Sequence, residues 1–72
     1  MSTLVPEELR QYLAEAINPE TPSHRLKNLA VHPEWLVRSL VAKNPSTPAL
    51  SIEILVEDIH PLVRDSAYYG RR

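Results

Sequence analysis

Three histidines, His24, His32 and His60, are the residues of this chain that could most readily ligate a metal. None has a second histidine four residues away or a carboxylate at metal-ligand spacing, so we expect no metal site. The chain has no cysteine, which excludes disulfides, iron–sulfur clusters, thiolate zinc sites and cysteine catalysis. We interpret the histidines as helix-start and surface residues and expect no cofactor.

The serine and threonine hydroxyls offer little for covalent catalysis. A nucleophilic hydroxyl needs a histidine and an orienting acid beside it, whereas the hydroxyls of this chain fall mostly in turns or on helix surfaces. A glycine-rich phosphate loop needs several glycines, and the chain has a single one. We therefore expect that the protein is not an enzyme.

Two arginines, Arg38 and Arg64, each follow a Leu-Val pair. A row of guanidinium groups along one surface would bind a carboxylate or phosphate of a partner. The alternative, which we favour, is structural: each arginine folds back onto carbonyl groups of the neighbouring turn or pairs with a glutamate. With the basic tail Arg71 and Arg72, these arginines define an alternative function, an anion- or nucleic-acid-binding module. The net charge of −1 makes nucleic acid an improbable partner, because such binding needs a basic surface.

The prolines mark a repeat that would position these residues. Residues 18–22 and 44–48 both read Asn-Pro-x-Thr-Pro, and residues 18–43 aligned on 44–69 share eight identities without a gap. The identities fall at turn and apolar positions, as they do in structural repeats. Asn18 and Asn44 occupy equivalent positions, and the distance in sequence between them is called the repeat spacing below. The residue one further repeat spacing after Asn44 is Gly70. We predict that three helices end in the left-handed conformation that Asn and Gly tolerate, at Asn18, Asn44 and Gly70.

Between the turns, apolar residues recur with helical spacing and no segment alternates with period two, so the predicted fold class is all-α. The helices are expected over residues 6–17, 22–31, 33–43, 48–57 and 59–69. The predicted inward side chains are Leu9, Tyr12, Leu13, Ala16, Ile17, Leu26, Leu29, Ala30, Leu36, Val37, Leu40, Val41, Ile52, Leu55 and Val56.

With 72 residues the chain forms one domain with a small core. The longest apolar run is a few residues, and no basic segment follows Met1, so we expect neither a membrane span nor a signal peptide and a cytoplasmic location. The single helical-repeat domain over 1–72 divides into an N-terminal helix or cap (1–17), a first repeat (18–43), and a second repeat with a C-terminal cap (44–72).

Residues 32–38 read His-Pro-Glu-Trp-Leu-Val-Arg and stand between a short leucine-bearing helix and the next Asn-Pro turn. This pattern resembles the leucine-rich repeat variant family and, more widely, HEAT and armadillo repeats. The resemblance covers residues 16–69 and implies a short right-handed α-solenoid of helix pairs that serves as an interaction scaffold without a catalytic site. The second unit departs from the pattern because Pro61 is shifted by two places. The iron–sulfur module of some members cannot be carried over to a chain without cysteine.

Leu50 and Ile54 are the first candidates for an interaction surface. They align with polar residues of the first repeat, so an apolar pair stands on a helix face that is polar one unit earlier. The pair is either covered within the chain, by Tyr68 or Tyr69, or in contact with another molecule, because an exposed apolar patch promotes association.

Trp35 is a further candidate, because it aligns with Pro61 and a core tryptophan would not be so replaced. It is either an interface anchor, as large aromatic residues often are, or a core residue. Two repeats are fewer than a solenoid usually has, and small scaffolds often gain burial by oligomerising. We therefore predict a scaffold for protein–protein interaction that self-associates, as a dimer.

Overall fold

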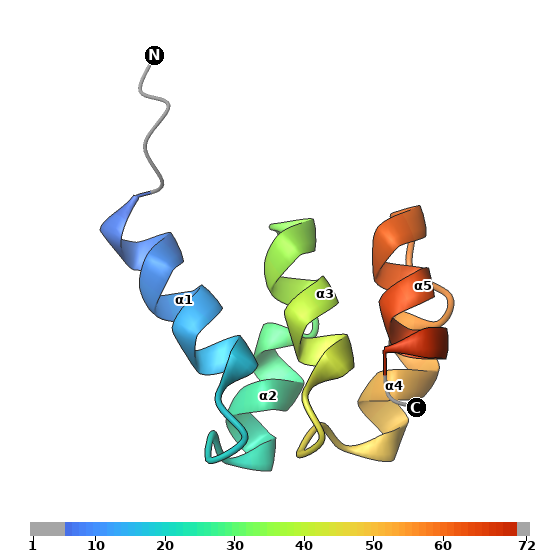
Figure 1. The fold of residues 1–72 in the computed structure, drawn as a ribbon, viewed down its shortest axis with the longest axis horizontal. Coiled ribbons are helices and arrows are strands. Elements are labelled where there is room, and N and C mark those ends of the chain that lie inside the picture. Colours follow the sequence, from blue (N-terminus) through green and yellow to red (C-terminus); the bar gives the residue numbers. More distant parts are fainter. Residues whose placement is uncertain (1–5, 71–72) are drawn as a thin grey trace.

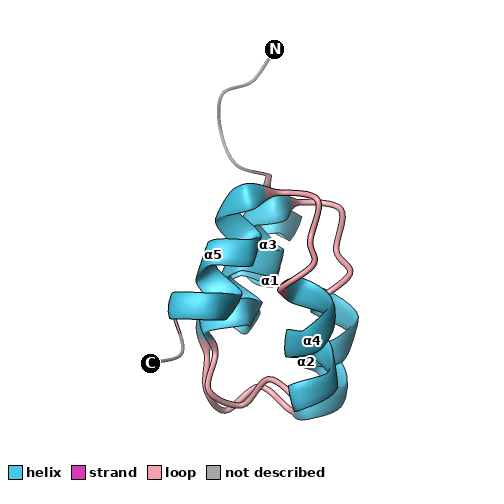
Figure 2. Ribbon diagram, turned by 90° about the vertical axis from the view of Figure 1, so that its right-hand side faces the viewer, coloured by secondary structure: helices cyan, strands magenta, loops and turns pink. Residues whose placement is uncertain are grey.

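The computed structural model describes residues 6–70, and over this range the chain forms five α-helices and no strand. The helices are α1 (Glu7–Ile17), α2 (Ser23–Leu29), α3 (Trp35–Lys43), α4 (Ala49–Leu55) and α5 (Pro61–Tyr69). The all-α prediction is confirmed. The longer helices α1, α3 and α5 lie side by side in one layer, and the short helices α2 and α4 form a second layer against it (Figures 1 and 2).

Prolines set where most of the helices begin. Pro6, Pro22 and Pro48 are the residues before α1, α2 and α4, and their carbonyl oxygens accept the first helical hydrogen bonds. Pro61 is the first residue of α5. A backbone N–H at that position has no acceptor within the helix, so the helix loses no hydrogen bond by having proline there. Helices α3 and α5 begin two residues later than the sequence predicts, and the short helices end two residues earlier.

The predicted left-handed helix ends are wrong. Asn18 and Asn44 have extended backbones, with φ near −80° and −73°, and Gly70 is right-handed. The proline after each asparagine restricts that asparagine to the extended region, and its side-chain oxygen accepts the N–H of the residue two places on, at 2.9 Å in both turns. Gly70 serves close packing instead, since a Cβ there would lie 2.6 Å from the carbonyl oxygen of Ser66 and 2.7 Å from Cγ of Lys43.

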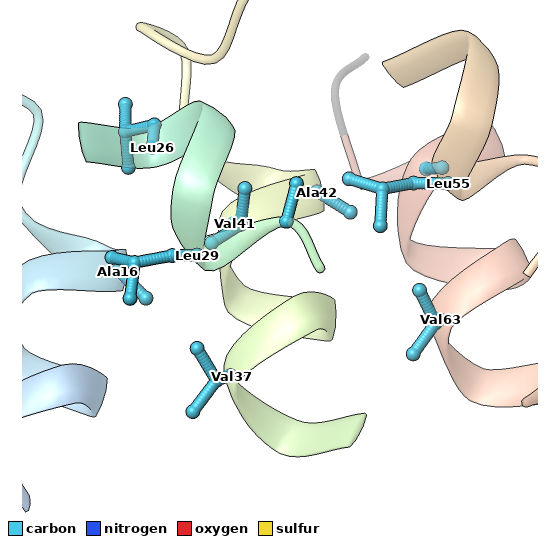
Figure 3. Packing of buried hydrophobic residues seen from close by; sticks show 10 residues of the cluster. Ala16, Leu26, Leu29, Val37, Val41, Ala42, Leu55 and Val63 are labelled. Carbon is cyan, nitrogen blue, oxygen red and sulfur yellow. The ribbon is translucent and has the colours of Figure 1, made fainter. Parts of the chain in front are cut away.

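The core fills the space between the two layers (Figure 3). Its fully buried large side chains are Leu26, Leu29, Val37, Val41, Leu55 and Val63, accompanied by four alanines. Most of the predicted inward residues are confirmed, but Leu36 and Ile17 are exposed. Leu36 precedes Val37 and so points about 100° away from it around α3; Leu62, which precedes Val63, is exposed in the same way.

The two Asn-Pro turns have the same hydrogen bonds and are also bonded to each other. The hydroxyl of Thr21 donates to the carbonyl of Glu15, and that of Thr47 to the carbonyl of Val41, both at 2.7 Å. The buried side chain of Asn44 donates to the carbonyls of Ala16 and Asn18, at 2.8 and 2.9 Å. These bonds tie the second turn to the first and fix the spacing of α1 and α3.

Candidate functional site

Leu50 and Ile54 lie on the surface of α4, with 74% and 59% of each residue exposed. Together with Val31, which is 69% exposed, they line a groove between α2 and α4. The pair is exposed and neither Tyr68 nor Tyr69 lines this groove, so the alternative that a tyrosine covers the pair is wrong. The groove, named the α2–α4 groove below, has a volume of about 490 Å³ and is also lined by Lys27, Asn28, Ala30, Pro48 and Ser51.

Side-chain size explains why the α2–α4 groove is hollow. Its two buried lining residues, Ala30 and Ser51, are small and leave space between the helices. The walls are formed by larger exposed side chains, with Leu50 and Ile54 one helical turn apart on α4 and Val31 just beyond the end of α2. An apolar surface of this shape is suited to receiving apolar side chains of another molecule.

Position 27 and its equivalent in the second repeat carry opposite charges, and of these two residues only Lys27 lines the groove. Lys27 lines the groove from α2, and Glu53, its equivalent in the second repeat, precedes Ile54 on α4. Both are exposed, and neither belongs to the ion pairs found within residues 6–70, which are Arg25–Glu15 and Arg38–Asp58. These two side chains therefore remain available for charges on a partner.

Trp35 and Tyr69 line a different groove, formed by α3 and α5 in the long-helix layer. This groove has a volume of about 480 Å³, and the exposed Leu36 and Leu62 also line it. Trp35 is half-buried against the core and stacks on the ring of His60, with centroids 4.3 Å apart. It thus combines a packing role with a position on a surface groove. Tyr68 is exposed and lines neither groove.

Arg38 is fully engaged within the chain. Its Nη1 donates to the carbonyls of His32 and Pro33, at 2.8 and 3.0 Å. Its Nε and Nη2 donate to the two carboxylate oxygens of Asp58, at 2.8 and 3.0 Å. The side chains of this pair are only 13% and 9% exposed. Arg38 therefore has the carbonyl contacts of the structural alternative, and its acidic partner is an aspartate.

Arg64 has the same carbonyl contacts, and within residues 6–70 it has no acidic partner. Its Nη1 donates to the carbonyls of Asp58 and Ile59, at 2.6 and 3.2 Å, and the side chain is exposed. Arg71 and Arg72 lie outside the described residues. Arg38 and Arg64 are therefore not equivalent: the guanidinium of Arg38 is bound to Asp58, whereas that of Arg64 is exposed.

Asp58 has a pKa below its ordinary value. Burial by itself raises the pKa of this carboxyl, but the hydrogen bonds from Arg38 and from the backbone N–H of His60, with the Arg38 charge, outweigh it. The side chain that caps α5 is that of His60, whose Nδ1 accepts the N–H of Leu62. Asp58 instead fixes the turn before α5 and joins that turn to α3.

Several hydroxyls and two of the three histidines, His32 and His60, form contacts within the chain. The hydroxyls of Ser39 and Ser66 bond to each other at 2.6 Å, buried between α3 and α5. His32 packs against Tyr12, with ring centroids 4.6 Å apart, and its Nδ1 accepts the N–H of Glu34. Within residues 6–70 no group of three or more histidine and acidic side chains is arranged to hold a metal ion, and none of the helices described there is long and apolar enough to cross a membrane.

Val31 and Lys27 are surface residues that the sequence did not single out. The exposure of Val31 could have been predicted from the sequence, because its equivalent in the second repeat is the charged residue Glu57 and Val31 lies outside the apolar stripe of its predicted helix. Comparison of the chain with protein-family models, curated proteins and solved structures finds no match. The resemblance to leucine-rich repeat variants therefore rests on the sequence motifs.

Proposed function

We propose that the protein is a non-enzymatic helical-repeat scaffold that acts in the cytoplasm by protein–protein contact, and that it associates with a second copy of itself through the α2–α4 groove. The supporting observation is the contiguous exposure of Val31, Leu50 and Ile54 beside a hollow lined by small buried residues. Contiguous apolar surface of this kind marks association sites in soluble proteins.

We also propose that the helices form a short right-handed α-solenoid of the leucine-rich repeat variant type. Supporting this arrangement, the hydroxyl bonds of Thr21 and Thr47, the Asn-Pro turns and the arginine–carbonyl bonds all recur at the repeat spacing. Two such units bury little apolar surface by themselves. Association through the short-helix layer would supply further burial.

A two-fold arrangement suits the residues around the groove. In such a dimer the same surface of each copy is used, so each contact occurs twice. Leu50 and Ile54 of one α4 would enter the groove of the other copy. Lys27 of each copy would then approach Glu53 of the other, and these opposite charges would favour the pairing.

The dimer is tested by light scattering after size exclusion, over protein concentrations from low to high micromolar. We expect the unmodified protein to dimerise and Ile54→Asp to remain monomeric, because a carboxylate would be buried at the centre of the interface. Ile59→Asp is the matched control, since Ile59 is 89% exposed and does not line the groove. A strictly monomeric unmodified protein, or unchanged assembly in Ile54→Asp, would refute the proposal.

The alternative of an anion- or nucleic-acid-binding arginine row gains no support from these contacts. Such a row needs several free guanidinium groups on one surface, and Arg38 is bonded to Asp58 and to two carbonyls. A nucleic-acid complex would also show a steep fall in affinity with salt.

A further inference from the structure

Tyr12, Arg38 and Arg64 follow one another at the repeat spacing and occupy equivalent places on α1, α3 and α5. Tyr12 packs its ring against His32, in the turn that joins α2 to α3. Arg38 binds Asp58, in the turn that joins α4 to α5. His32 and Asp58 are themselves equivalent in the two repeats. No residue of the described chain fills the corresponding place beside Arg64.

The guanidinium group of Arg64 is nevertheless held as that of Arg38 is. In both arginines Nη1 donates to the carbonyls of two consecutive residues in the turn before the helix. In Arg38 the edge formed by Nε and Nη2 then binds both oxygens of a carboxylate. In Arg64 the same edge has no acceptor among residues 6–70, although the group is already oriented.

We propose that the Nε–Nη2 edge of Arg64 is a binding site for an aspartate or glutamate carboxylate of a different protein. The Arg38–Asp58 pair is the template for this site within the same molecule. A planar guanidinium binds a carboxylate through two parallel hydrogen bonds. Because the carbonyl bonds already hold the group, little side-chain entropy is lost on binding.

The neighbouring residue on α5 supports an interface at this place. Tyr68 follows Arg64 by four residues, so both lie on the same side of the helix, and Tyr68 is exposed. Its equivalent on α3 is Ala42, which is buried in the core. An exposed aromatic side chain thus lies on the same side of α5 as Arg64, and aromatic and arginine side chains are frequent anchors of protein interfaces.

A second copy stacked on α5 in the register of the repeat would not match the site. The residues that occupy the place of Asp58 in the preceding units are His32 and Pro6, and neither carries a carboxylate. Residues 6–70 supply no carboxylate at this place, and the proposed ligand is that of a different protein. The Arg64 site is independent of the α2–α4 groove, because the two involve different helices.

The test is a titration of the ¹⁵N-labelled full chain with sodium acetate at constant ionic strength, followed through the arginine Nε–H signals by NMR. Arg10 is the internal control, because its side chain has no hydrogen bond or ion pair within residues 6–70. We expect the Arg64 signal to shift with an apparent Kd at least about threefold lower than that of Arg10, because its guanidinium is pre-oriented. Arg38, already bound to Asp58, should not shift.

A peptide and a variant provide the second arm. The peptide of residues 58–62 with blocked termini carries Asp58 as its one carboxylate, and its Asp58→Asn form is the matched control. We expect the Asp peptide to shift Arg64 more than the Asn peptide does, and Arg64→Lys, which keeps the charge but loses the fork, to abolish that difference. Equal shifts of Arg64 and Arg10 with acetate, no shift of Arg64, or equal effects of the two peptides would overturn the proposal.

Discussion

At the scale of single residues, Asp58 shows how one carboxylate organises two parts of the chain. It binds Arg38 on α3 through both oxygens and accepts the backbone N–H of His60 just before α5. The pair is largely shielded from water. Removing one member of a buried ion pair costs far more stability than the intact pair contributes, because the other charge stays buried without a partner.

Arg38→Met tests this directly. We expect the free energy of unfolding, measured by urea denaturation, to fall by about 3 kcal/mol, because Asp58 would keep a shielded charge. Arg10→Met is the control, because Arg10 is exposed on α1, and surface changes of this kind stay within about 0.5 kcal/mol. Equal effects of the two substitutions would show that the ion pair contributes nothing to stability.

The lowered pKa of Asp58 makes stability depend on pH in the acid range. Because the carboxyl has a lower pKa in the folded chain than in the unfolded chain, the unfolded state binds more protons as the pH falls. The contribution of Asp58 is therefore complete above the unfolded pKa of about 4 and is lost as the pH falls through the lower folded pKa. No loss from this group is expected between pH 5 and pH 7 (about one unit or more above that pKa).

The measurement is urea denaturation at a series of acid pH values, for the unmodified protein and for Asp58→Asn. We expect the difference in stability between the two to shrink as the pH falls below about 4. Asp65→Asn serves as the control, because Asp65 forms no ion pair within residues 6–70. A difference that stayed constant through the acid range would contradict the role assigned to the Asp58 carboxylate.

At the scale of elements, the two Asn-Pro turns are alike in sequence but differ in what they bond. The side-chain oxygens of Asn18 and Asn44 close their own turns in the same way. Only Asn44 also donates to the preceding turn region, at the carbonyls of Ala16 and Asn18. The second turn therefore carries the connection between successive long helices, and the first does not.

The two asparagines form a matched pair for mutagenesis. We expect Asn44→Ala to lower the free energy of unfolding by about 2–3 kcal/mol, because it removes a buried amide and with it the hydrogen bond to the buried carbonyl of Ala16. Asn18→Ala removes one exposed turn bond and should lower it by less than about 1 kcal/mol. Thermal or urea unfolding of both variants measures the difference, and equal losses would refute the bridging role of Asn44.

At the scale of the whole molecule, two helical layers leave apolar surface on both sides. The short-helix layer exposes Val31, Leu50 and Ile54, and the long-helix layer exposes Leu36 and Leu62. A domain of this size buries a smaller fraction of its surface than larger domains do. Its stability is therefore expected to depend on association as well as on its own core.

If the α2–α4 groove is the dimer interface, the thermal midpoint must depend on protein concentration. Association that involves only the folded state adds stability by mass action, about 2.7 kcal/mol for a hundredfold excess over the dissociation constant. We expect Tm to rise with concentration for the unmodified protein and for Ile59→Asp, and to be constant for Ile54→Asp. A concentration-independent Tm in the unmodified protein would contradict self-association at this groove.

The sequence by itself determined the helices, their interruptions and most of the core. These are local properties: a proline limits the residue before it and the helix after it, and the spacing of apolar residues selects the buried stripe. The same local rule accounts for two of the three wrong left-handed helix ends, because the prolines after Asn18 and Asn44 override the tolerance of asparagine for the left-handed region.

Only the tertiary structure decided which sides of the helices stay open and which charges meet. Leu36 follows the apolar pattern yet is exposed, and Leu50 and Ile54 are left uncovered by the tyrosines. The pairing of Arg38 with Asp58, far apart in the sequence, and the free edge of Arg64 likewise appear only once α3 and α5 are placed side by side. The physical reason is that helix periodicity fixes which residues share a face, whereas the packing of separate helices fixes what that face meets.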